Sequence, residues 1–175
     1  SRVSTQFTNE GLSSTFHGLA RMGWTAQNMS PSLLQSLEGA LQRVVSSLGS
    51  RNATSNTARV MSSLMWSLGQ LEMMWHHTAF TEGVETQEGE SDYHLLYSRR
   101  KALSKHSIKL LSSALEENAM LMNEQGIFST LSGFAKMGAE WQHLGKPLTN
   151  ALTASLRANS PYMRTKAVCH TLWAL

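Results

Sequence analysis

Ser14, His17 and Arg21 are spaced so that a helix would present a hydroxyl, an imidazole ring and a guanidinium together. They stand at i, i+3 and i+7, which is the spacing of neighbours along one side of a helix. Such a face can hold a phosphate and an unstacked base, and stacking of a base on an aromatic ring contributes roughly 1–3 kcal/mol. A solvated helix face is the alternative explanation.

Equivalent faces follow further along the chain. The corresponding positions are Ser63, Trp66 and Gln70, then Ser129, Ser132 and Lys136, and then His170 and Trp173. The triplet at 99–101 can contact phosphate or can neutralise the acidic segment before it. For the two tryptophans the alternative is packing against a neighbouring unit. The predicted RNA-binding residues are His17, Arg21, Trp66, Gln70, Arg99, Arg100, Lys101, Lys136 and Trp173.

Other chemistries find little support in the residues. There is no glycine-rich phosphate loop, no GxSxG and no HExxH, and Asp92 is the only aspartate. His76-His77 and Cys169-His170 are adjacent pairs, and neighbours on a helix point about 100° apart, which makes a poor chelate. We therefore expect no enzyme activity, no bound metal and no cofactor.

Charge is distributed unevenly along the chain. The net charge is +3, but five of the 12 acidic residues lie between Glu82 and Asp92. The rest of the chain carries 15 basic residues against seven acidic ones. A basic body of this kind suits a polyanionic partner, and a solvated basic surface is the alternative.

An internal repeat organises these faces. Residues 9–23 and 124–138 align without gaps and share seven identities, among them Gly18/Gly133 and Met22/Met137. A third copy occupies residues 58–72, and a fourth begins at residue 166. Equivalent positions at 16, 65, 131 and 172 indicate a unit of about 40 residues with one insertion, which is typical of two-helix solenoid repeats.

Local signals favour helices throughout. Leu12, Phe16 and Leu19 continue an apolar stripe with a 3.6-residue period. Gly23 and Gly138 are suited to end helices, and Ser30-Pro31 is suited to begin one. No segment alternates with period two for long enough to predict a strand.

The predicted fold class is all-α, an α-solenoid of two-helix repeats with about three full units and a truncated fourth. The predicted units of this single array (1–175) are 8–56, 57–122 with an acidic loop insertion at 78–98, 123–164, and the truncated 165–175. We expect the array to be part of a longer chain.

The repeated helix resembles a known type. LMWSLGQLE (64–72), FHGLARMGW (16–24), LSGFAKMGAEW (131–141) and HTLWAL (170–175) are similar to the LWALAKLG helix of the octotricopeptide and heptatricopeptide repeat families. The second of these often occurs in proteins that end in a RAP domain. The resemblance implies an α-solenoid that binds RNA in mitochondria or plastids and governs transcript stability or translation; in some lineages such repeats are ribosomal subunits.

These observations together predict an organellar RNA-binding protein. Interrupted, degenerate units on a basic body favour a component of the mitochondrial ribosome, or a factor bound to it, that holds rRNA or mRNA beside neighbouring proteins. A plastid location is the alternative. The competing function is a protein–protein scaffold or an accessory subunit of an organellar membrane complex, in which the groove holds another protein's helix. We expect no membrane span within the chain.

Overall fold

The computed structural model describes residues 8–48, 53–75 and 101–163, and these residues are helical with short connections. The α-helices are α1 (Asn9–Arg21), α2 (Pro31–Ser47), α3 (Ser55–Gln70), α5 (Lys105–Asn118), α6 (Glu124–Lys136) and α7 (Lys146–Asn159). Three short 3₁₀ helices are η4 (Ala119–Leu121), η5 (Trp141–His143) and η6 (Ser160–Tyr162). Within the described ranges the only strand-like pairing is a single bridge between Met74 and Ala102. The predicted all-α class is confirmed for this part of the chain.

Short polar side chains begin the described α-helices except α7, whose first turn follows Gly145 without a side-chain cap. Ser30 accepts a hydrogen bond from the Leu33 N–H at 3.3 Å, and Pro31 is the first residue of α2, as predicted. Thr54 and Thr57 bond each other's backbone N–H at the start of α3. Each cap satisfies a backbone donor that has no partner inside its helix.

The ends of α1, α3 and α6 share one geometry. Gly23 and Gly138 take positive φ angles of 75° and 67°, which confirms them as the predicted helix stops. In α3 the equivalent residue is Glu72, which adopts the same left-handed conformation with φ of 56°. In each case the next residue's N–H bonds back to a carbonyl five positions earlier, for example Trp24 to Leu19.

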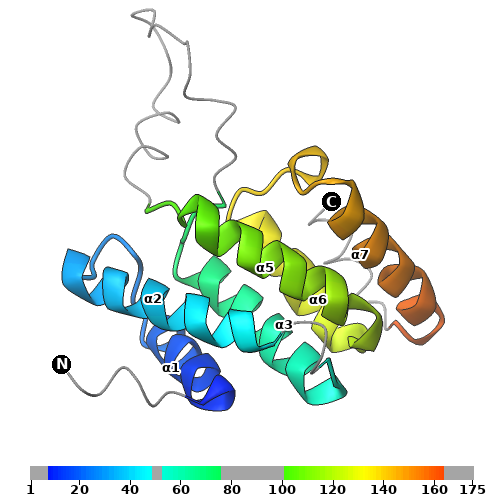
Figure 1. Cartoon of the computed structure of the whole chain (residues 1–175), viewed down its shortest axis with the longest axis horizontal. Helices are drawn as coiled ribbons and strands as arrows, with labels where there is room; N and C mark the ends of the chain where they lie inside the picture. The colour runs from blue at the N-terminus through cyan, green and yellow to red at the C-terminus, as the bar shows by residue number, and fades with distance from the viewer. Residues whose placement is uncertain (1–7, 49–52, 76–100, 164–175) are drawn as a thin grey trace, which may run out of the picture.

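The helices form two rows (Figure 1). One row contains α1, α3 and α6, the other α2, α5 and α7, and each helix contacts its neighbours in the row. Neighbours in the first row run parallel, since Glu10 meets Arg59 near the amino ends and His17 meets Trp66 further along. Figure 1 shows α2 and α5 in front, with α3 and α6 behind them.

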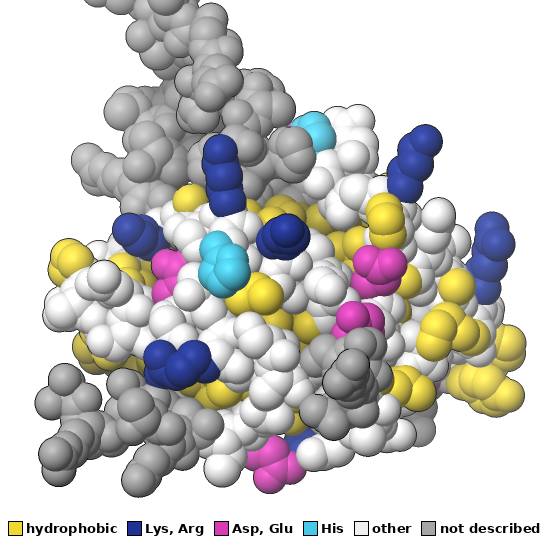
Figure 2. Space-filling view, viewed as in Figure 1, with side chains coloured by type: hydrophobic (Ala, Val, Ile, Leu, Met, Phe, Trp, Pro, Cys, Tyr) yellow, Lys and Arg dark blue, Asp and Glu magenta, His cyan; other side chains and the backbone are white. Residues whose placement is uncertain are grey.

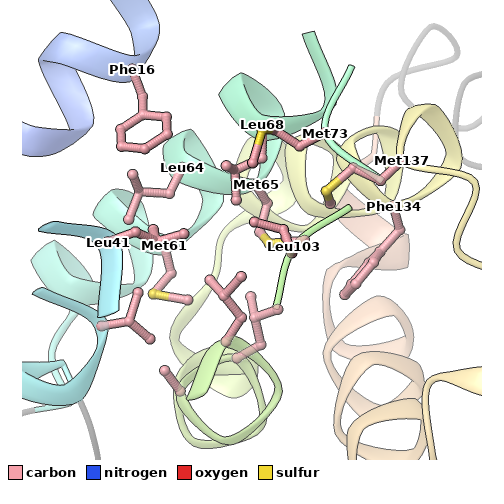
Figure 3. Packing of buried hydrophobic residues seen from close by; sticks show 14 of the residues in the cluster. Phe16, Leu41, Met61, Leu64, Met65, Leu68, Met73, Leu103, Phe134 and Met137 are labelled. Carbon is pink, nitrogen blue, oxygen red and sulfur yellow. The ribbon is translucent and has the colours of Figure 1, made fainter. Parts of the chain in front are cut away.

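The core lies between the rows, and α3 is at its centre. Met61, Leu64, Met65 and Leu68 of α3 are fully buried. Figure 3 shows them packed among side chains from both rows, including Phe16 of α1. Buried apolar area of this kind contributes about 25 cal/mol per Å² to folding, so packing on α3 holds the two rows together.

Backbone hydrogen bonds join successive helices of the first row. The Ala26 N–H, in the turn after α1, donates to the carbonyl of Leu71 at the end of α3 (2.8 Å). The Trp75 N–H, in the turn after α3, donates to the carbonyl of Met137 at the end of α6 (3.0 Å). The same joint therefore fixes α3 against α1 and α6 against α3.

Two asparagines make an equivalent connection in the second row. Asn118 at the end of α5 donates to the carbonyls of Leu48 (3.1 Å) and Ala114 (2.8 Å). Asn159 at the end of α7 donates to the carbonyls of Met122 (3.0 Å) and Ser155 (2.9 Å). Each asparagine is followed by a 3₁₀ turn, η4 or η6.

Candidate functional site

An open groove of about 980 Å³ lies along α3, between α1 and the segment formed by η4 and α6. Its lining residues come from α1, from α3 and from the segment formed by η4 and α6. Its polar and aromatic lining residues include His17 of α1, Asn56, Arg59, Ser63 and Trp66 of α3, and Asn123, Gln125 and Ser129 at the start of α6.

A pair of rings forms one wall of the groove. The centroids of His17 and Trp66 are 5.0 Å apart and their planes are tilted by 34°. Both side chains are half-buried, so each packs on the protein and remains open to the groove. The two rings come from equivalent positions of the first and second repeats, and a base could stack on such a surface.

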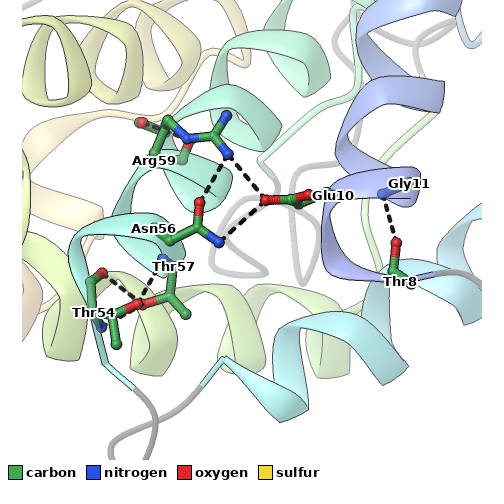
Figure 4. Close-up of polar contacts among 8 residues, drawn as sticks. Thr8, Glu10, Gly11, Thr54, Asn56, Thr57 and Arg59 are labelled. Atoms are coloured by element: carbon green, nitrogen blue, oxygen red, sulfur yellow. Dashed lines mark hydrogen bonds and ion pairs between the residues drawn. The ribbon is translucent and has the colours of Figure 1, made fainter.

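A polar cluster lies about two helical turns from the rings, toward the amino ends of α1 and α3 (Figure 4). The Arg59 guanidinium lies 3.2 Å from the Glu10 carboxylate and donates to the Asn56 side-chain oxygen at 2.8 Å. The side chains of Arg59 and Glu10 are 67% and 63% exposed. Exposed ion pairs contribute at most about 1 kcal/mol, so an incoming phosphate can replace Glu10 as the partner of Arg59.

Helix orientation adds positive potential at the same end. Because α1, α3 and α6 run parallel, their amino ends lie together, near Asn56 and Asn123. The amino end of a helix carries a partial positive charge and free N–H groups. Glu10 in the first turn of α1 and Glu124 in the first turn of α6 offset part of this charge.

The predicted residues fall into three groups. His17 and Trp66 line the groove. Arg21, Gln70 and Lys136 lie in the last turns of α1, α3 and α6, beyond the groove, with Arg21 and Lys136 exposed and Gln70 half-buried. Arg99, Arg100 and Trp173 lie outside the described residues, as do the predicted acidic insertion (78–98) and the truncated unit (165–175).

Two positions of the predicted face belong elsewhere. Ser132 is buried with 7% exposure, since its short side chain does not reach the surface to which the rings of His17 and Trp66 extend. Lys101 is exposed, but its charge acts on Glu38 of α2 and not on the groove. The described part of the basic triplet is therefore associated with the second row.

Glu38 joins α2 to the start of α5. Its carboxylate accepts hydrogen bonds from the Ser104 N–H (2.8 Å) and the Ser107 hydroxyl (2.7 Å). Burial raises the pKa of Glu38, but these hydrogen bonds, that of the Ser104 hydroxyl and the Lys101 charge outweigh burial and hold the pKa below its ordinary value. The ionised carboxylate acts as a clamp between the two helices.

The face in view in Figure 2 does not concentrate charge. Lys and Arg side chains lie apart from one another there, with Glu side chains between them. This is the side on which Figure 1 places α2 and α5 in front. Aromatic and hydrogen-bonding groups converge instead in the groove along α3.

Arg59, Asn56 and Gln125 are groove residues that the sequence pattern did not single out. Arg59 and Gln125 stand four positions before Ser63 and Ser129, so they continue the predicted stripe by one turn toward the amino end. Extending the stripe in that direction would have found both. Asn56 follows from the packing of α1 against α3, because it donates to Glu10 at 3.3 Å.

Among the described residues no group of three or more His, Cys, Asp or Glu side chains is placed to hold a metal ion. None of the described helices combines the length and the apolar character needed to cross a membrane. Comparison of the chain with protein-family models, with curated proteins and with solved structures found no match.

Proposed function

We propose that this chain is an RNA-binding α-solenoid of an organelle, and that it works as a component of the mitochondrial ribosome or bound to it. The groove along α3 would hold an unpaired stretch of RNA. The observation that carries the proposal is the His17–Trp66 ring pair, which opens into a groove beside the Arg59 guanidinium. Rings for stacking next to a cation for phosphate are the combination that single-stranded RNA requires.

The repeat geometry supports the solenoid part of the proposal. The three first-row helices are each followed by a residue in the same left-handed conformation, and the same backbone joint links α1 to α3 and α3 to α6. Solenoids are built by such repetition of one contact between neighbouring units. Arg21, Gln70 and Lys136 occupy equivalent positions in the last turns of these helices, beyond the groove, where we expect them to contact RNA that extends past it.

The direct test is binding of a 12-nucleotide single-stranded RNA of mixed sequence, followed by fluorescence anisotropy. Trp66→Ala removes one stacking surface, and a loss of about 1–3 kcal/mol raises Kd by roughly 5- to 150-fold. Tyr162→Ala is the matched control, because Tyr162 is an aromatic residue with 75% exposure that does not line the groove. Equal Kd values for the Trp66 and Tyr162 variants would refute the groove as the RNA site.

The cellular part of the proposal requires a different measurement. The endogenous protein from an organelle lysate is sedimented through a gradient, with and without ribonuclease. Migration with a ribosomal subunit that is lost on digestion supports the ribosomal assignment. A light peak that still shifts with ribonuclease would leave RNA binding intact and replace the ribosome with a transcript as the partner.

A protein partner is the second candidate, and one feature favours it. Leu121, which lines the groove, is 42% exposed, and the adjacent Met120 is 58% exposed. Apolar side chains at this edge would suit another protein's helix. Sedimentation that is indifferent to ribonuclease, together with no binding of the RNA probe, would select this function.

A further inference from the structure

Glu10 occupies a repeat position that lines the groove in the two other units. The position that holds Glu10 in α1 holds Arg59 in α3 and Gln125 in α6, and both of these line the groove. Further along the same stripes the three helices carry only hydroxyl, aromatic, amide and basic side chains. These are Ser14, His17 and Arg21 in α1, Ser63, Trp66 and Gln70 in α3, and Ser129, Ser132 and Lys136 in α6. Glu10 is therefore the acidic exception in a pattern that otherwise suits a polyanion.

The Glu10 carboxylate is bound by two donors of α3. Its Oε1 atom accepts a hydrogen bond from the Arg59 guanidinium at 3.2 Å and another from the Asn56 side-chain amide at 3.3 Å. Arg59 also donates to the Asn56 side-chain oxygen at 2.8 Å. The two side chains stand three residues apart on α3, so they are neighbours on its surface and present their donors together. Figure 4 shows both donors directed at the same Glu10 oxygen.

This geometry is that of an anion site that already holds an anion. A guanidinium and an amide N–H that converge on a carboxylate oxygen can make the same charge-assisted hydrogen bonds to a phosphate oxygen. The described lining of the groove includes Asn56 and Arg59 but not Glu10. The donors therefore belong to the groove wall, and the carboxylate reaches them from α1. A phosphate in the groove and the Glu10 carboxylate compete for the same two donors.

We propose that Asn56 and Arg59 form a subsite for one phosphate of the bound RNA, and that Glu10 occupies this subsite in the free chain and lowers the affinity for RNA. The inference rests on the proposed function, since the phosphate belongs to RNA held in the groove. It adds a role for α1 beyond stacking through His17. Binding of RNA releases Glu10 from Arg59, so the ion pair that the free chain makes is lost in the complex.

The test measures the Kd of the same 12-nucleotide RNA by fluorescence anisotropy for wild type and for Glu10→Gln. Glutamine keeps the size of the side chain and removes the charge that competes with phosphate. We expect Kd to fall roughly two- to fivefold, because the exposed ion pair that RNA must break stabilises the free chain by no more than this factor. Circular dichroism checks that the variant keeps the helicity of wild type.

A double-mutant cycle separates this competition from a general effect of net charge. In a chain that already carries Arg59→Gln, the further change Glu10→Gln should leave Kd unchanged, because Glu10 then has no cation to hold. A general charge effect would instead lower Kd by the same factor in both backgrounds. Glu116→Gln removes an exposed carboxylate of α5 and should leave Kd near that of wild type.

The outcomes distinguish this inference from the proposed function. Equal Kd values for wild type and Glu10→Gln, or the same fall in Kd with and without Arg59, would overturn the Glu10 subsite. If Trp66→Ala still weakened binding in that case, the groove would remain the RNA site. No binding of the RNA by wild type would overturn both. Inorganic phosphate that displaced the RNA from Glu10→Gln at equal concentration of phosphate groups would also overturn the inference, since the subsite would then take a free anion.

Discussion

Glu72 adopts the left-handed backbone conformation that glycine adopts at the equivalent position of the two neighbouring repeats. Its φ angle is 56°, against 75° for Gly23 and 67° for Gly138. The left-handed region costs a residue with a side chain roughly 1–2 kcal/mol, because the Cβ atom crowds the backbone. The middle repeat therefore stores local strain at the end of its first helix.

Glu72→Gly should relieve this strain. We expect the free energy of unfolding to rise by about 1 kcal/mol, offset in part by the greater freedom of glycine in the unfolded chain. Urea denaturation followed by circular dichroism measures the change. Gly138→Ala is the converse substitution and should lower stability, and a Glu72→Gly variant no more stable than wild type would contradict the strain.

Gly18 and Gly133 show how one repeat position acquires opposite roles in two helices. They are equivalent residues of α1 and α6, but only Gly133 faces another helix at close range. Gly18→Ala should stabilise the chain by about 0.5–1 kcal/mol, because alanine favours a helix over glycine. Gly133→Ala should destabilise it by about 1–3 kcal/mol, since α6 must move away from α3.

Thermal unfolding of the two variants tests this contrast. The intrinsic helix preference of alanine is the same at both positions, so the difference between the variants isolates the packing of α6 on α3. Similar changes in Tm for the two substitutions would mean that the close crossing contributes nothing to stability.

The Glu38 carboxylate, which bonds α2 to the start of α5, should make the stability of the folded chain depend on pH. The pKa of Glu38 is lowered in the folded chain from its ordinary value of 4.5. A lowered carboxyl pKa contributes stability that is fully present above the unfolded value of 4.5 and is lost as the pH falls through the folded value. We expect stability to fall below pH 4.5 and the Glu38→Gln variant to lose less of it over the same interval.

Unfolding midpoints in urea from pH 3 to pH 7 give this measurement. Glu116→Gln on α5 is the control, because Glu116 is exposed and makes no contact with Ser104 or Ser107. If the urea midpoints of wild type and Glu38→Gln changed with pH in the same way, Glu38 would not stabilise the contact between α2 and α5.

Helices and their ends could be predicted from the sequence, because the signals are local. The apolar period, Ser30-Pro31 and the two glycines each act within a few residues. The roles of Asn118 and Asn159 could not, since each side chain bonds a carbonyl contributed by a distant part of the chain. Arg59 itself lies one turn before Ser63 on the predicted stripe, but its ion pair could not be predicted, because the partner Glu10 comes from a different helix.

At the scale of the whole molecule, RNA affinity should depend on salt through residues at both ends of the first row. Arg21 and Lys136 are exposed on α1 and α6, and α3 lies between these helices. Reversing both charges with Arg21→Glu and Lys136→Glu would remove the two phosphate contacts that the proposed function assigns to them. The slope of log K against log salt concentration should become shallower by about 1.4, at about 0.7 per contact for a single strand.

Anisotropy titrations between 50 and 300 mM salt measure this slope. The control is Lys105→Glu with Lys109→Glu, which changes the net charge by the same amount at two exposed positions of α5, in the second row. This variant should keep a slope near that of wild type. The same change of slope in both double variants would assign the effect to total charge instead of to the first-row face.

The joints between first-row helices use backbone atoms at both ends. Ala26 and Trp75 donate through their N–H groups, although one side chain is a methyl group and the other an indole. The hydrogen bond itself therefore accepts very different side chains, while packing decides which of them fit, because Ala26 and Trp75 are both buried. The hydrogen bond excludes only proline, since proline has no N–H to donate. Copies linked in this way can diverge far from a common ancestor and still stack as their ancestor did.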